Sequence, residues 1–190
     1  MPLPDPTRRK LSHTRQVILR GYERDDGLWD IEGHLVDSKT YAFSNRDRGE
    51  VKAGEPVHAM WLRITVDDDL KIHDAVASTD AAPFKVCPLI TTRYQRLIGL
   101  SIGPGWGLKI KQLFNGVEGC THLTELLGPL ATTAYQTLFA RREERARANP
   151  DHGRPQILDT CHALASDGEV VKSLWPQFYS GSAHPRSEPA

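Results

Sequence analysis

The sequence has no hydrophobic run that is long enough to cross a membrane. A transmembrane helix needs about 20 consecutive apolar residues, and charged or turn-forming residues interrupt the apolar runs of this chain well before that length. The first six residues, MPLPDP, also lack the basic and apolar regions of a signal peptide. We therefore expect a cytoplasmic protein with no membrane partner.

The chain also lacks an excess of either charge. It contains 24 Lys and Arg and 24 Asp and Glu, which leaves a formal net charge of zero. Proteins that bind nucleic acid through their overall charge carry an excess of cationic residues. We therefore expect no nucleic-acid partner and favour a small molecule as the ligand.

Cysteine is scarce, and its spacing excludes two classes of site. Cys87, Cys120 and Cys161 are odd in number and widely separated, which argues against a disulfide framework. No Cys-x-x-Cys pair is present, so a metal knuckle within one short segment is excluded as well. Each cysteine therefore remains a candidate metal ligand, nucleophile or core residue.

The patterning predicts one α+β domain over residues 12–179, between flexible tails at 1–11 and 180–190. Residues 15–24 and 28–36 are β-type runs around an Asp-Asp-Gly turn, and 58–66 and 70–78 are β-type runs around three aspartates. Two hairpins predict an antiparallel four-stranded sheet. From residue 91 the apolar spacing becomes helical, which predicts helices packed on one face of that sheet. We expect short helices after residue 91, at 108–114 and at 157–164, and one long helix that starts near residue 123 and has its last turns at 141–147.

The segment GCTHLTELL contains the densest group of reactive side chains. Cys120, His122 and Glu125 lie within six residues at the predicted start of the long helix. The free amide groups and positive dipole end of a helix start favour thiolate over thiol. Cys120 is therefore a candidate nucleophile or metal ligand, and His122 a candidate acid or base.

Strand alternation assigns two further histidines to opposite environments. His34 shares a face with Asp30 and Glu32, opposite the apolar residues of its strand. His58 instead shares the face of Met60 and the apolar residues that follow it. A histidine at the edge of an apolar stripe is placed either for packing or for proton transfer.

Cationic and hydroxyl side chains of the first strand suit the binding of a carboxylate. Tyr22 and Arg24 lie on one face of the strand, and Arg15 lies upstream beside His13. A guanidinium can hold a carboxylate through paired hydrogen bonds. We expect Arg15 and Arg24 to anchor an organic anion and Tyr22 to orient it.

Four motifs resemble a widespread bacterial family that is catalogued only as a domain of unknown function. They are HTR at 13–15, GYERDDGLWDIEG at 21–33, PVHAM at 56–60 and GCTHL at 119–123, and the resemblance extends over residues 10–180. Members of that family are sometimes encoded beside genes for the breakdown of plant-derived aromatic acids, so the resemblance favours an enzyme.

The order of elements also resembles the iron-sulfur scaffold and sulfur-acceptor fold of the IscU and SufE type. That resemblance implies that Cys87 and Cys120 match the second and last scaffold cysteines. The first scaffold cysteine has no counterpart in the strands, and only Cys161 could replace it.

Two functions therefore compete. The first is an enzyme without a cofactor that acts on an aromatic carboxylic compound by a lyase or decarboxylase-type reaction. The second is a carrier of metal, iron-sulfur or persulfide, in which three cysteines and a histidine would hold zinc or an iron-sulfur cluster. An interaction domain with core cysteines, and a homodimer through an exposed sheet face bearing Trp29 and Trp61, are further expectations. The enzyme's expected catalytic residues are His58, Cys120, His122 and Tyr22, its substrate-binding residues Arg15, Arg24 and His34, and the carrier's ligands Cys87, Cys120, His122 and Cys161.

Overall fold

The computed structural model describes residues 3–148, 153–155 and 157–181, which form two compact units, Met1–Arg142 and Glu143–Ala190. Residues 3–11 contain no helix or strand and are exposed, whereas most of the predicted tail at 180–190 lies outside the described residues. The first unit contains the sheet and its covering helices. It is the unit that positions the site.

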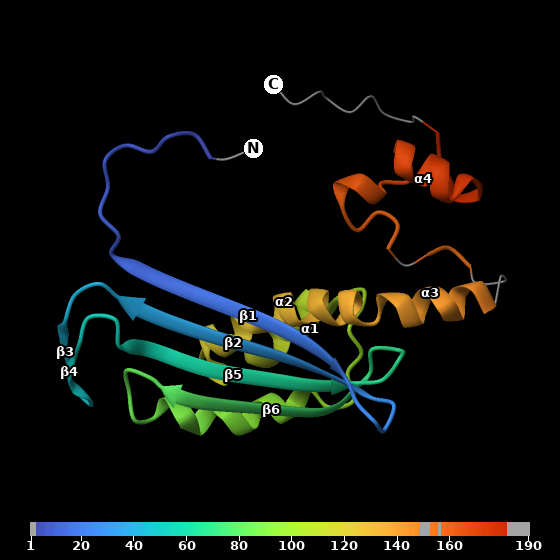
Figure 1. Ribbon diagram of the computed structural model, residues 1–190. Helices are drawn as coiled ribbons and strands as arrows, with labels where there is room; N and C mark the ends of the chain where they lie inside the picture. Colours follow the sequence, from blue (N-terminus) through green and yellow to red (C-terminus); the bar gives the residue numbers. More distant parts are fainter. Residues whose placement is uncertain (1–2, 149–152, 156, 182–190) are drawn as a thin grey trace. The chain divides into compact units, whose positions relative to one another are not determined.

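The first unit is built on a four-stranded antiparallel sheet, as predicted (Figure 1). Its order is β1-β2-β5-β6, so each predicted hairpin forms and the second strand of one pairs with the first strand of the other. Gly27 enables the first hairpin turn because its φ of 82° lies in the left-handed region. The strands are β1 (His13–Glu23), β2 (Trp29–Lys39), β5 (Pro56–Val66) and β6 (Ile72–Ala81).

A small third hairpin, between β2 and β5, was not predicted. It consists of β3 (Phe43–Asn45) and β4 (Gly49–Val51). The Asn45 side-chain oxygen accepts hydrogen bonds from the backbone N–H groups of Asp47 and Arg48, both at 3.0 Å, and Gly49 follows with a φ of 77°. Strands of three residues are too short for a periodic signal, but the asparagine and glycine mark the turn.

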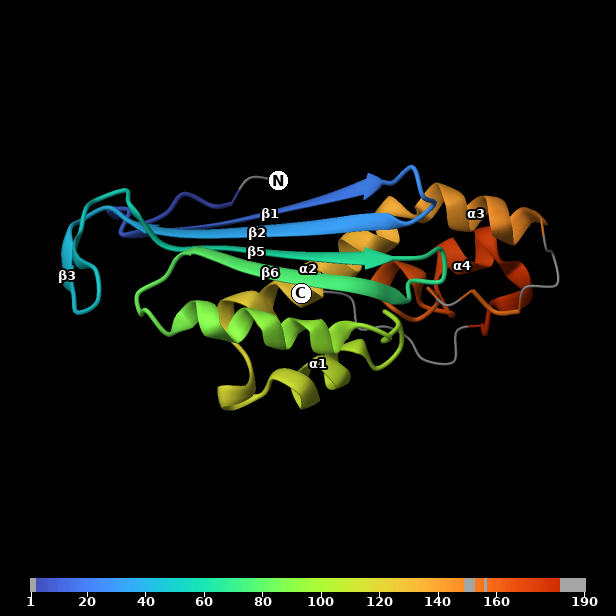
Figure 2. The ribbon, with the colours of Figure 1, turned by 90° about the horizontal axis from the view of Figure 1, so that it is seen from below.

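Helices cover one face of the sheet (Figure 2). The side chains of β2 that point to the other face, such as those of Asp30 and Glu32, are only partly buried. The alternation predicted for β2 is confirmed, since Ile31 and Leu35 are buried while His34 lies on the opposite face. There His34 stacks on Trp61, with ring centroids 3.7 Å apart. The expectation that Trp29 is exposed beside Trp61 was wrong, because Trp29 belongs to the buried stripe and donates its indole N–H to Asp68.

The helices largely follow the prediction, with four corrections. The helix expected soon after residue 91 is a 3₁₀ helix over Cys87–Leu97. The long helix ends at Thr137, and a separate helix follows Leu138. Leu108 is 63% exposed because Trp106 and Ile110 fill the buried face of the helix at 106–114. The predicted helix at 157–164 is mostly turns, since Asp159 adopts a φ of 62°. The elements are η1 (Cys87–Leu97), α1 (Trp106–Phe114), η2 (Gly116–Glu118), α2 (Thr121–Thr137), α3 (Phe139–Ala148), η3 (His162–Leu164), α4 (Glu169–Leu174) and η4 (Pro176–Phe178).

Helix α2 packs on β1, β2 and β5 through the predicted leucine stripe. The helix and the sheet approach closely at Gly21 of β1, where an added Cβ would lie 1.9 Å from the Thr137 hydroxyl oxygen. Within the described part of the chain, no helix is long and apolar enough to cross a membrane. The stripe fixes the rotation of α2, and therefore determines which of its residues face the sheet.

The start of α2 is held by the hydroxyl group of Tyr94, a fully buried residue of η1. This oxygen accepts the backbone N–H of Cys120 at 3.0 Å, donates to the Cys120 carbonyl at 3.0 Å and lies 2.8 Å from the Thr124 hydroxyl. The Tyr94 ring also stacks on Phe114. One side chain thus connects the core to the first turn of α2.

Replacement of Tyr94 by phenylalanine is expected to lower the free energy of unfolding by about 1–3 kcal/mol, because two hydrogen bonds to the Cys120 backbone are lost. The Cys120 N–H loses the Tyr94 hydroxyl, and the Cys120 carbonyl keeps only the N–H of Thr124. Urea denaturation followed by circular dichroism measures the change. Tyr22→Phe is the matched control, since Tyr22 is 44% exposed. Equal losses in the two variants would contradict the assigned role of the Tyr94 hydroxyl.

Candidate functional site

The centre of the site is the carboxylate of Asp37, which lies near the end of β2 and is only 1% exposed. Strand register places Arg15 of β1 and His58 of β5 directly opposite Asp37 on either side. Oδ1 accepts hydrogen bonds from His13 Nε2 at 3.1 Å and Arg15 Nε at 2.8 Å. Oδ2 accepts from Arg15 Nη2 at 2.9 Å and His58 Nδ1 at 3.0 Å. Both oxygens of this buried charge are therefore satisfied.

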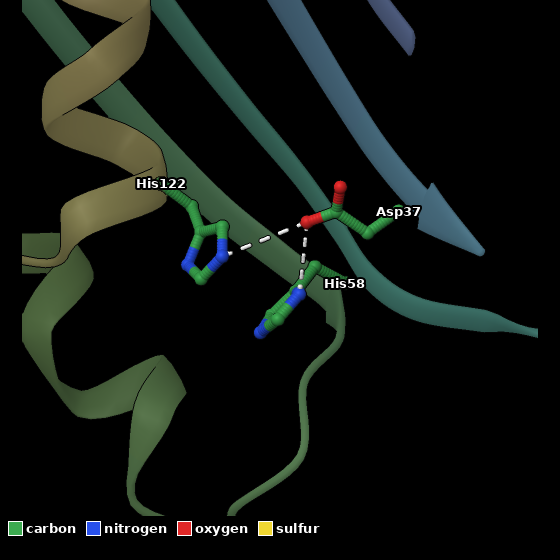
Figure 3. Close-up of side chains that lie close together, drawn as sticks. All are labelled: Asp37, His58 and His122. Carbon is green, nitrogen blue, oxygen red and sulfur yellow. Dashed lines mark hydrogen bonds and ion pairs between the residues drawn. The ribbon is translucent and has the colours of Figure 1, made fainter. Parts of the chain in front are cut away.

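His122 joins the group from the first turn of α2. Its Nε2 lies 3.6 Å from Asp37 Oδ2, and its ring stacks on that of His58 with centroids 3.7 Å apart. Figure 3 shows one nitrogen of each imidazole directed at the same carboxylate oxygen, while the other nitrogen of each points away. The two imidazoles therefore share one anionic partner.

Cys120 directly precedes α2, and its sulfur faces the second nitrogen of His122. Cys120 Sγ lies 3.9 Å from His122 Nδ1 and 3.9 Å from the sulfur of buried Met60. Cys120, His122 and Asp37 thus form a line from thiol to imidazole to carboxylate. The structure brings Cys120 and His122 together at the sheet, as the sequence predicts.

Glu125 lies one helical turn after His122 and contacts the outer edge of Arg15. Arg15 Nη1 donates to Glu125 Oε2 at 2.5 Å. The Glu125 side chain is 52% exposed, in contrast to buried Asp37. Arg15 therefore bridges a buried carboxylate of the sheet and an exposed carboxylate of the helix.

The environment favours neutral imidazoles beside an ionised carboxylate. Burial lowers the pKa of His58, the charge of His122 lowers it further, and Asp37 only partly opposes these effects. Burial and the charge of Arg15 likewise lower the pKa of His122. Burial would raise the pKa of Asp37, but the hydrogen bonds and charge of Arg15 outweigh it, and the pKa is lowered. Asp37 can therefore only accept, so His58 Nδ1 donates to it and the lone pair lies on Nε2.

The same three side chains have a geometry that could hold a metal ion. The ligand atoms of Asp37, His58 and His122 lie within 4.8 Å of one another. Tetrahedral zinc with bonds of about 2.0–2.1 Å needs ligand separations of roughly 3.4 Å, which the 3.0 and 3.6 Å distances bracket. The adjacent Arg15 guanidinium opposes a second cation. Among the described residues no such group contains a cysteine.

Several predicted site residues lie elsewhere. Arg24 is nine positions from Arg15 along an extended strand, or about 30 Å, and pairs with Asp26 and Asp30. Tyr22 is close to Arg24, and His34 is on the opposite sheet face. Cys87 begins η1, and Cys161 is exposed in the second unit.

Asp37 is the residue that sequence reasoning missed. It continues the alternating stripe of Ile31 and Leu35, so a carboxylate stands at a position where the pattern demands an apolar side chain. A charged residue on a buried stripe needs a partner. That signal was available in the sequence.

Residues 99–103 read GLSIG and match the Gly-x-Ser-x-Gly pattern of a serine nucleophile, which sequence reasoning also overlooked. The pattern requires a serine on a turn between a strand and a helix. Ser101 instead forms an isolated bridge with Lys71, next to the start of β6, and is exposed. This lies at the end of the sheet opposite Asp37.

The free energy of unfolding of the metal-free protein is expected to fall between pH 7.5 and pH 5.5. The folded-state pKa values of His58 and His122 are lowered, so the unfolded chain takes up more protons as the pH falls through about 6.5. The lowered pKa of Asp37 adds a further loss below about pH 4. Urea denaturation in the presence of EDTA measures both. An equally steep loss in a His58→Asn, His122→Asn double variant would contradict this origin.

Comparison with curated proteins and with solved structures found no match. The resemblance to the IscU and SufE fold therefore stays a prediction. A family model does match residues 13–136, a range that contains His13, Arg15, Asp37, His58, His122 and Glu125. The chain thus belongs to the family described as "Protein of unknown function (DUF2889)".

Proposed function

We propose that this protein is an enzyme that transfers a proton on a small aromatic carboxylic compound, in a lyase or decarboxylase-type reaction, with His58 as the base. One observation carries the proposal. His58 donates from Nδ1 to a buried carboxylate, while its Nε2 makes no hydrogen bond with the described part of the chain. A neutral imidazole oriented in this way presents a lone pair to a substrate.

Asp37 supports this role before and after proton transfer. Its hydrogen bond fixes the tautomer and orientation of His58, and its charge stabilises the imidazolium that forms when Nε2 takes up a proton. Arg15 and His13 hold Asp37 in place from the opposite side. The carboxylate therefore orients the base without becoming the base.

His122 and Cys120 supply the second proton-handling group. Because His58 and His122 lie together on one carboxylate, a charge on one lowers the pKa of the other. One imidazole can therefore carry the proton while its neighbour stays neutral and acts as a hydrogen-bond donor. The Cys120 thiol contacts the far nitrogen of His122 and supports it.

His58→Asn is expected to lower turnover of the preferred aromatic acid by about 10²–10⁴-fold, the usual contribution of general acid–base catalysis. His122→Asn is expected to lower it as well. Conversion of a panel of aromatic acids, followed by chromatography and mass spectrometry, measures the effect. The control is His73→Asn, because His73 is exposed and pairs with Asp67. Full activity of the His58 variant would refute the proposal, and unchanged activity of Cys120→Ser would remove the thiol from the mechanism.

A divalent metal centre is the second candidate function, and the convergence of Asp37, His58 and His122 favours it. It replaces the cysteine ligands expected from the sequence with two imidazoles and a carboxylate, donors that suit zinc, iron and related metals. The two candidate functions exclude each other because they require different states of the Nδ1 atom of His58. A metal would take the Nδ1 lone pair of His58, whereas the acid–base mechanism requires a proton there.

If the metal centre is correct, elemental analysis of protein purified without affinity-tag metal should find about one equivalent of a transition metal. His122→Asn should remove the metal, because it deletes a ligand, while Cys87→Ser should retain it. EDTA should abolish turnover. Metal-free protein with full turnover would exclude the metal centre and leave the acid–base enzyme.

A further inference from the structure

The two carboxylates bound by Arg15 differ in how easily they can be exchanged. Asp37 is buried and accepts two hydrogen bonds from the guanidinium, so its release would leave a buried charge without a partner. Glu125 accepts one hydrogen bond, and its side chain is half exposed. Exposed ion pairs shift an equilibrium by only about one- to fivefold. The contact with Glu125 is therefore the replaceable one.

We infer that the edge of Arg15 facing Glu125 is a binding site for an organic carboxylate, and that Glu125 is displaced when this ligand binds. Arg15 uses three of its five N–H groups for Asp37 and Glu125, and one N–H on each terminal nitrogen has no partner in the described part of the chain. Once Glu125 leaves, both terminal nitrogens can donate to the incoming carboxylate.

The position of this edge places the ligand beside the imidazoles. Glu125 lies three residues after His122 in α2, and residues at that spacing are neighbours on a helix surface. Arg15 and His58 donate to the same oxygen of Asp37. A carboxylate that replaces Glu125 therefore brings the rest of its molecule near His58 and His122. The inference thus rests on the proposed function for the chemistry that follows binding.

The charges around Arg15 predict in which direction a change at Glu125 alters the affinity for a carboxylate. With neutral imidazoles, Asp37 and Glu125 carry two negative charges against the single positive charge of Arg15. This excess opposes an incoming anion, and Glu125 also competes directly for the Arg15 edge. Removal of the Glu125 charge should therefore strengthen the binding of a carboxylate. A Glu125 that lies far from the bound carboxylate would give no such gain.

The test is the dissociation constant of benzoate for the wild-type protein and for Glu125→Gln, measured by NMR titration. We expect the variant to bind benzoate about fivefold more tightly, while the uncharged analogue benzamide shows no change. Glu118→Gln is the matched control, because Glu118 is a half-exposed glutamate that pairs with Arg93 and Arg96 just before α2. It should bind benzoate like the wild type. Acetate, titrated alongside, shows whether the aromatic ring adds affinity.

Unchanged or weaker benzoate binding by Glu125→Gln would overturn the inference, as would an equal gain for benzamide or no benzoate binding by either protein at tens of millimolar. A different result would refute the proposed function. If Glu125→Gln binds benzoate more tightly but His58→Asn retains full turnover, the carboxylate site stands and the acid–base mechanism falls. If His58→Asn loses turnover while Glu125→Gln gains no affinity, the mechanism stands and the carboxylate site falls.

Discussion

The buried charge of Asp37 is the constraint on which the rest of the site depends. An unpaired carboxylate at 1% exposure would destabilise the fold by several kcal/mol, so donors must reach it from both neighbouring strands. Arg15 and His58 do so because strand register places them opposite Asp37. A slip of one residue would turn them to the other sheet face. The charge therefore helps to specify the strand pairing that creates the site.

The helical side of the site depends on a second, independent constraint. The leucine stripe of α2 and the close contact at Gly21 set how the helix lies on the sheet, and the Tyr94 hydroxyl sets where the helix begins. Together they direct His122 and Glu125 toward Asp37 and Arg15. The apolar core thus positions the polar groups of the site.

How much of the structure could be predicted depends on how far apart in the sequence the interacting residues lie. The two hairpins and the faces of β2 were predictable because alternation and turn residues are local signals. The link between Arg15 and Glu125 was not, because it joins residues 110 positions apart and depends on how α2 packs. Grouping Arg15 with Arg24 and Tyr22 failed for a geometric reason, since an extended strand separates residues by about 3.3 Å each. Asp37 could have been identified from the sequence, because it is a charged residue at a position of the alternating apolar stripe of β2.

Exchange of Glu125 for a substrate carboxylate has a consequence for the two imidazoles. Asp37 and Glu125 both raise the pKa of His122 against the lowering effects of burial and Arg15. An incoming ligand that displaced no anion would add a negative charge and shift both imidazoles toward their protonated forms. A ligand that takes the place of Glu125 leaves the local charge nearly constant. The neutral state that proton abstraction by His58 requires is then preserved while the substrate is bound.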